Sequence, residues 1–266
     1  MRPAAAVAGG PARDLRPHGF RRLVVAVLAL DVRALARDHV ALLTVLLSVA
    51  GTAGVTALGL FRADQPGWSA WFPFIVAASL VGGPAGFGLL FGLLMVEETR
   101  TGVRDALAVT PAPPGLLLLV RTAVAAAWGF AWPLASVLLM NSTWRVLDLG
   151  VHEWLAVVSP LAVLTAACAL LIPGLADDQV GALAVFKAVS FVTLFPLALF
   201  FVPDHADYRL LLLASPTGWI VQGYRAFAQN DPASGFRLAL AGTIYGAGLL
   251  GFAVRHFRRR VYRLHL

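Results

Sequence analysis

The chain has 266 residues, of which 59% are hydrophobic and 13% are charged, and its formal net charge is +7. A globular domain is roughly 45–50% apolar and about 25% charged. This composition therefore excludes an ordinary soluble protein and indicates that part of the protein surface faces the hydrocarbon of a membrane. The excess of basic residues is concentrated at the two ends and in short loops, which is typical of a membrane protein and argues against a nucleic-acid-binding domain.

Residues 1–39 are expected to form a cytoplasmic and interfacial segment. Asp31 and Arg33 interrupt the apolar stretch that would be needed for a cleaved secretory leader. Arg22, Arg33 and Arg37 fall on one helical face, which suits a segment that rests on anionic lipid headgroups.

Six stretches are apolar and long enough to cross a bilayer, which requires about 20 residues in a helix. They cover residues 40–61, 71–96, 116–140, 154–176, 179–203 and 238–254. The sequence therefore predicts an all-α protein, a polytopic membrane helix bundle whose transmembrane domain occupies residues 40–254. Residues 255–266 follow as a basic cytoplasmic tail.

The basic residues predict the orientation of this bundle. If both ends, the connection around residues 97–121 and Lys187 lie on one side, that side holds 16 of the 21 Arg and Lys residues. Basic residues in short segments mark the cytoplasmic side, so we expect both termini to be cytoplasmic.

Glycines spaced four apart occur in two of the predicted spans. The pairs are Gly82 with Gly86, Gly88 with Gly92, and Gly242 with Gly246. Small residues at this spacing allow helix backbones to approach closely, and we expect them to pack within the bundle; a kink that moves during transport is the alternative.

Sequence motifs for catalysis and metal binding are missing. Lys187 is the only lysine, and no phosphate-binding loop of the GxxxxGK[ST] type surrounds it. No pair of histidines has the HExxH spacing, and Cys168 is the only cysteine. The acidic pair Asp177 and Asp178 is expected to form a solvated turn. We therefore expect no cofactor or metal bound by this chain and no enzymatic activity of its own.

The connection between the second and third spans has the pattern of a short amphipathic helix. It begins with Glu97 and Glu98, which are favourable at a helix N-terminus, and ends at Thr110-Pro111. Val103 and Leu107 share one face. A purely structural linker would have the same periodicity, so the pattern alone leaves both interpretations open.

The same stretch resembles permease subunits of ABC-2 type transporters. After their second span these proteins carry two charged residues, followed after three intervening positions by Gly-Thr-Leu. A single Leu and then Val-Thr-Pro complete the pattern. The matching positions here are Glu97, Glu98, Gly102, Leu107, Val109, Thr110 and Pro111, whereas Val103 and Arg104 depart from the pattern. Residues 179–188 are similar to the start of the fifth span in a subgroup labelled fluoroquinolone or multidrug export permeases.

The resemblance continues into the segment before the last span. Pro216, Trp219, Tyr224 and Arg225 stand where such permeases have an external Pro-aromatic-Arg segment. Apolar runs at 210–213 and 219–227 suggest short helices that dip into the outer leaflet. By resemblance they would cap the export path; a loop resting on the membrane is the alternative.

The resemblance implies an ATP-driven exporter of the bacterial inner membrane. A separate ATPase subunit would bind ATP and Mg²⁺, and the 97–111 helix would sit in its groove as a coupling helix. A second permease chain, identical or homologous, would complete the path. The cargo would be an apolar or amphipathic small molecule such as a drug, an antibiotic or a lipid-like compound, which links the family to multidrug efflux and antibiotic resistance.

Two charged residues fall inside the predicted spans. Lys187 lies roughly 10 Å into the fifth span by helical rise, where it either snorkels to the interface, paired with a nearby acid, or serves in coupling or the transport path. Arg121, near the start of the third span, is expected to be an interface anchor. Glu97 and Glu98 are expected to pair with bases at neighbouring span ends.

Two other classes of function remain open at this point. A membrane-embedded enzyme would require a spaced set of acidic or nucleophilic residues within the spans, and none is evident. A membrane anchor or assembly protein would need no such set. An ATPase that copurifies with the chain would favour the transporter.

Overall fold

A computed structural model gives the structure of the protein. It describes residues 39–62, 69–101, 114–144, 149–203 and 209–262, together with residues 25, 29, 32, 33, 36, 37 and 67. Within these ranges the long elements are all helices, and no strand occurs. The helix α2 (His39–Arg62) is followed by a 3-10 turn η1 (Ser69–Trp71) and by α3 (Phe72–Arg100).

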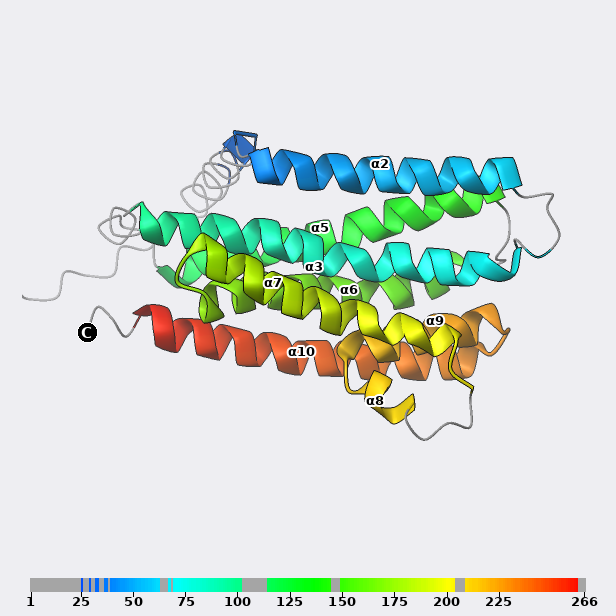
Figure 1. Cartoon of the computed structure of the whole chain (residues 1–266). Coiled ribbons are helices and arrows are strands. Elements are labelled where there is room, and N and C mark those ends of the chain that lie inside the picture. The colour runs from blue at the N-terminus through cyan, green and yellow to red at the C-terminus, as the bar shows by residue number, and fades with distance from the viewer. Residues whose placement is uncertain are drawn as a thin grey trace, which may run out of the picture.

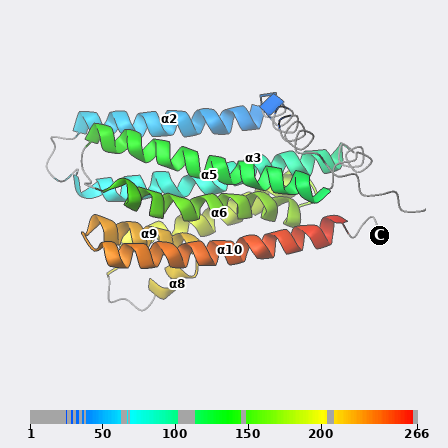
Figure 2. The ribbon, with the colours of Figure 1, turned by 180° about the vertical axis from the view of Figure 1, so that it is seen from behind.

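The rest of the chain continues the bundle. The helices are α5 (Pro114–Trp144), α6 (Val151–Leu175), α7 (Gln179–Leu194), the 3-10 turn η2 (Phe195–Phe200), α8 (Arg209–Leu213), α9 (Pro216–Ala228) and α10 (Pro232–Tyr262). The long helices lie side by side and alternate in direction, and α8 and α9 lie beside one half of α10 (Figure 1). The view from behind shows the same order (Figure 2).

Six helices of the described chain are long and apolar enough to cross a membrane, as the sequence predicted. They are Leu42–Phe61, Phe72–Glu98, Leu118–Thr143, Val151–Leu175, Gln179–Phe200 and Pro232–Arg260. The last is longer than the predicted stretch 238–254, because the helix continues through the charged residues at both of its ends. The helices expected at 210–213 and 219–227 are found as α8 and α9.

The helix α6 forms the centre of the bundle. It contacts α3, α5, α7, α9 and α10, and 67% of its most apolar stretch is buried inside the protein. Only 11% of the corresponding stretch of α2 and 17% of that of α7 are buried. Of the six spans, α2 and α7 therefore have the smallest share buried inside the protein.

One of the predicted glycine pairs lies where α3 crosses α6. A Cβ atom on Gly92 would come within 2.8 Å of the Cβ atom of Ile172, and one on Gly88 would collide with the side chain of Cys168. The expected close packing is thus found for this pair. A Cβ atom on Gly82 would have no neighbour within 4 Å, so the first glycine of the other pair in α3 is not at a contact.

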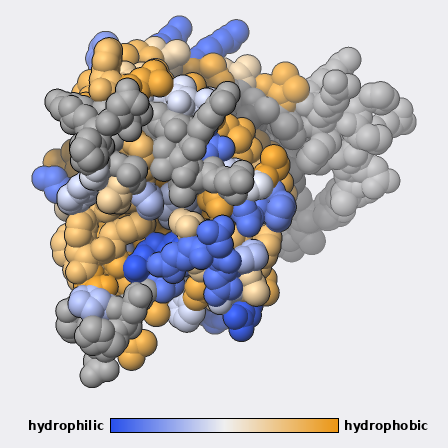
Figure 3. Space-filling view, turned by 90° about the vertical axis from the view of Figure 1, so that its right-hand side faces the viewer, coloured by the Kyte–Doolittle hydropathy of each residue, from blue (hydrophilic) through white to orange (hydrophobic). Residues whose placement is uncertain are grey.

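The two ends of the bundle are polar and its sides are apolar. Figure 3 looks onto the end opposite to the C-terminus, where hydrophilic residues gather in the middle and hydrophobic residues lie around them. This distribution suits a protein whose sides face hydrocarbon and whose ends face water.

Candidate functional site

Five helix ends meet at the end of the bundle that carries the C-terminus (Figure 1). They are the last turns of α3, α6 and α10 and the first turns of α5 and α7. The connection from α3 to α5 leaves and re-enters the bundle at this end. Its residues 102–113 lie outside the described residues, and with them the predicted coupling residues Gly102, Val103, Leu107, Val109, Thr110 and Pro111.

A buried ion pair links the two helices that flank this connection. Glu98, in the last turn of α3, accepts hydrogen bonds through both carboxylate oxygens from the two terminal nitrogens of Arg121, in α5. The side chains are only 12% and 5% exposed. An acid of the predicted pair therefore does pair with a base at a neighbouring span end. Arg121, predicted to be an interface anchor, is buried beside Glu98, which supplies its counter-charge.

The neighbouring acid, Glu97, links α3 to α7. Its Oε2 accepts a hydrogen bond from Gln179 Nε2 at 2.8 Å, and its Oε1 lies 3.2 Å from Arg100 Nη2. Gln179 is the first residue of α7. The last turn of α3 is therefore tied on one side to α5 and on the other to α7.

A third set of contacts joins α6 to α10. Arg260 lies 2.7 Å from each carboxylate oxygen of Asp177. The carbonyl oxygen of Gly174 accepts hydrogen bonds from Arg260 Nη1 at 2.6 Å and from His256 Nε2 at 3.0 Å. Asp178 caps α7 by accepting from the backbone N–H of Gly181 at 2.6 Å.

Sequence reasoning missed the partner of Asp177. It treated Asp177 and Asp178 as a solvated turn, and 83 residues separate Asp177 from Arg260. The only available signal was the presence of a basic tail and an acidic turn predicted to lie on the same side of the membrane.

Lys187 does not belong to this polar cluster. Its side chain is exposed, and within the described chain it forms no ion pair. The acids proposed as its partners are engaged elsewhere: Asp177 by Arg260, Asp178 by the α7 cap, and Glu97 by Gln179 and Arg100. An exposed lysine two turns inside an apolar helix is free to snorkel towards the interface.

The predicted external residues lie at the opposite end of the bundle, in and around α9. Arg225 donates to the carbonyl oxygen of Leu199 at 2.6 Å, and its guanidinium lies 5.4 Å from the ring centroid of Phe200. Tyr224 is buried and stacks on Trp154 of α6 with 6.1 Å between the rings. Pro216 is the first residue of α9, and Trp219 lies beside Gly242 of α10. These contacts hold α9 against η2, α6 and α10.

The polar side chains described at this end of the bundle form contacts between helices. Within the described part of the chain no group of three His, Cys, Asp or Glu residues could hold a metal ion. The charged groups instead join helix ends to one another. Side-chain contacts connect α3 with α5, α3 with α7, and the α6–α7 turn with α10.

A comparison with protein families gives one match. The family model described as fluoroquinolones export permease protein, Rv2686c-like, matches residues 31–254, which is most of the chain. The match includes all six membrane-length helices except the part of α10 after residue 254. No curated protein matched the chain.

Proposed function

The chain belongs to the Rv2686c-like fluoroquinolone export permease family, and from this premise we propose that it is the membrane-spanning permease subunit of an ATP-driven ABC exporter. Six membrane-length helices in a family of permeases make it a multi-pass membrane protein. It would use a separate ATPase subunit as its motor, which supplies ATP hydrolysis with Mg²⁺. The chain itself would contribute no catalytic residue.

The observation that carries this proposal is the way both flanks of the 102–113 segment are fixed. Glu98 and Arg121 join the end of α3 to the start of α5 through a buried pair of charges. A force applied to the segment would therefore be transmitted to the helices and not absorbed at its ends. Glu97 would extend the same movement to α7 through Gln179.

Glu97 and Glu98, which the sequence placed at the start of the coupling helix, instead end α3, whose C-cap is Thr101. In this proposal the coupling helix therefore lies within residues 102–111, on the cytoplasmic side. Val103 and Leu107 would enter a groove of the ATPase, and Glu97 and Glu98 would set the direction of the helix. The termini would be cytoplasmic and the membrane would be a bacterial inner membrane. The external residues Pro216, Trp219, Tyr224 and Arg225 would hold the helices that cap the path on the far side.

Two permease chains would form the path between them. The small buried fraction of α2 and α7 supports this part of the proposal, because these helices have apolar surface that a second chain can cover. The family name supports a fluoroquinolone as cargo. Such a drug is an amphipathic small molecule, the class expected from the sequence.

The test is export by cells that express the chain together with its ATPase. Leu107→Asp places a charge on the apolar face of the coupling helix, and we expect fluoroquinolone efflux to be lost while membrane insertion and protein level stay unchanged. Leu107→Met keeps the face apolar and is the matched control, which should retain efflux. If the Asp variant exports as well as the control, or if no ATPase copurifies with the chain, the proposal is wrong.

A further inference from the structure

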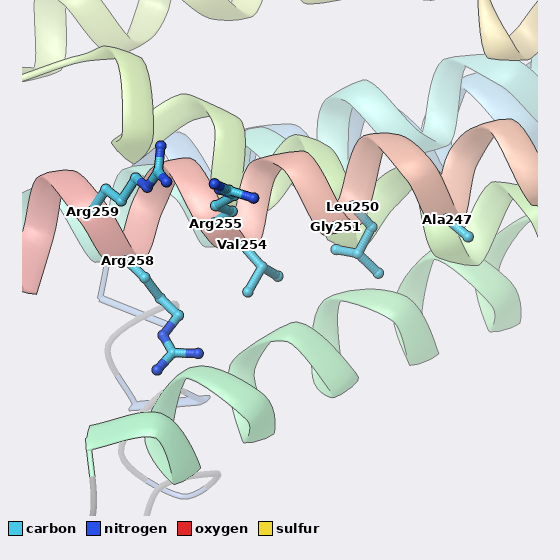
Figure 4. A pocket seen from close by; sticks show the side chains of 7 residues that line it. All are labelled: Ala247, Leu250, Gly251, Val254, Arg255, Arg258 and Arg259. Atoms are coloured by element: carbon cyan, nitrogen blue, oxygen red, sulfur yellow. The ribbon is translucent and has the colours of Figure 1, made fainter.

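A groove that the proposed function does not use lies along α10. It has a volume of about 570 Å³ and lies on the C-terminal half of the helix. The described residues that line it are Ala247, Leu250, Gly251, Val254, Arg255, Arg258 and Arg259. In Figure 4, Leu250, Val254 and Arg258 point to the side of α10 on which the start of α5 lies, and Arg255 and Arg259 lie along the opposite edge. Leu118 of α5 packs in the same buried cluster as Ala253 and Phe257 of α10.

The groove changes character along its length. From Ala247 to Val254 it is apolar, and at 1.5 Å per residue this part is about 10 Å long. One leaflet of a bilayer has a hydrocarbon thickness of about 15 Å. The arginines follow directly, within the last turns of the membrane-length helix that ends at Arg260. The apolar part therefore lies at the depth of acyl chains, and the basic part lies at the depth of headgroups.

Among the described residues, no acid pairs with the three arginines of the groove. All three are exposed, and none forms an ion pair within the described chain. Their neighbour Arg260 differs, because it is held by Asp177 and by the carbonyl oxygen of Gly174. Like charges one turn apart repel each other, so a bound anion is favoured here. Guanidinium groups bind phosphate oxygens with paired hydrogen bonds.

We propose that this groove binds one anionic phospholipid, with an acyl chain along Leu250, Gly251 and Val254, the phosphate held by Arg258 on the same side of α10, and Arg255 and Arg259 adding positive charge along the opposite edge. The lipid belongs to the leaflet on the side of the C-terminus, which is the cytoplasmic leaflet in the orientation proposed above. Its binding needs only this chain and does not depend on transport. A soluble anion would leave the apolar part of the groove unfilled, and a neutral lipid would leave the arginines uncompensated.

The bound lipid would join helices that the polar contacts leave separate. Arg255, Arg258 and Arg259 lie beside the Arg260 contact to the α6–α7 turn, and the acyl chain would lie beside α5. The lipid would therefore hold the end of α10 against the start of α5.

The experiment is native mass spectrometry of the purified full chain released from detergent, with phosphatidylglycerol or phosphatidylcholine added in equal amounts. We expect phosphatidylglycerol to be retained preferentially. The variant R255Q/R258Q/R259Q should lose that preference, with about fivefold weaker binding for each arginine removed. Arg237→Gln, at the other end of α10, is the matched charge control and should bind like the unchanged protein.

Substitutions at two glycines test the apolar half of the groove. A Cβ atom on Gly251 or on Gly248 would meet nothing within 4 Å, so both positions have room for a larger side chain. Only Gly251 lines the groove. Gly251→Phe should fill the groove and reduce phosphatidylglycerol binding, whereas Gly248→Phe should not. Circular dichroism checks that both variants keep their helices; the arginine variant carries the test if a glycine variant fails to fold.

Several results would overturn the assignment. If both lipids are retained equally, or if the triple arginine variant still prefers phosphatidylglycerol, the arginines form only a hydrated basic surface and the assignment is wrong. Competition by glycerol phosphate, which has the charge without the chains, would exclude a role for the groove. Displacement of the lipid by a fluoroquinolone would make the groove a drug site. If the chain forms a dimer and Gly251→Phe dissociates that dimer, the groove is an interface between copies of the chain.

Discussion

At the scale of single residues, the contact between Glu98 and Arg121 has the largest predicted effect. Replacing either residue with glutamine leaves the other charge buried without its partner. We expect Glu98→Gln or Arg121→Gln to lower the free energy of unfolding by about 3–5 kcal/mol, measured by denaturation in mixed micelles. The double variant should recover much of this loss, because neither charge then remains.

The pair formed by Arg100 and Glu97 is the control for this prediction. Its side chains are 62% and 38% exposed, and water already screens the two charges. Arg100→Gln should therefore cost less than about 1 kcal/mol. If Arg100→Gln destabilises the protein as much as Arg121→Gln does, burial is not the reason that the Glu98–Arg121 pair contributes to stability.

The sequence indicated which residues at this site carry charge but not how they pair. Glu97, Glu98 and Arg121 stood out because each lies at the border of an apolar stretch. Their partners depend on the rotation of each helix about its axis, which hydropathy does not report. The contact between Asp177 and Arg260 was missed for the same reason, since it depends on where α10 lies relative to the α6–α7 turn.

At the scale of helices, the crossing of α3 and α6 gives a second prediction. Gly92→Ala adds a methyl group 2.8 Å from the Cβ atom of Ile172, so one helix must move. We expect a loss of about 1–3 kcal/mol in stability, seen as a lower thermal unfolding midpoint in detergent. Gly82→Ala, on the same helix with open space around it, should leave the midpoint unchanged or raise it slightly. Equal midpoints for the two variants would contradict the close approach.

Helix ends were harder to predict than helix existence. The apolar stretch 238–254 ends at Arg237 and Arg255, yet α10 runs from Pro232 to Tyr262. Charged residues stop a hydrophobic stretch, but they do not stop a helix once its backbone is clear of hydrocarbon. Proline suits the first turn of a helix, which explains why α10 starts where it does.

At the scale of the whole molecule, the proposed orientation can be tested with single cysteines. Thr101 and Ser142 are exposed at opposite ends of the bundle. A membrane-impermeant maleimide should label Ser142→Cys in intact cells and Thr101→Cys only after the cells are permeabilised. The unchanged protein is the blank, because its one cysteine, Cys168, is buried. Labelling of Thr101→Cys in intact cells would reverse the topology and remove the basis for the coupling helix.

The number of crossings could be predicted, but the neighbours of each helix could not. The spans α3 and α7 are similarly apolar, yet 61% of the first and only 17% of the second are buried in the protein. A side chain that faces lipid and one that faces another helix satisfy the same hydropathy pattern. The glycine pairs Gly88/Gly92 and Gly242/Gly246 gave local hints of helix contacts, and both lie where α3 or α10 meets another helix.

The central place of α6 has a consequence for how the protein is made. The ribosome completes α2, α3 and α5 before α6, so these three helices enter the membrane while the helix that buries most of α3 does not yet exist. The surface of α3 around Gly88 and Gly92 stays unpacked until Cys168 and Ile172 have been translated. Assembly of the bundle is therefore a late event of synthesis, and a nascent chain that stops before residue 151 holds α3 and α5 without the helix that both contact.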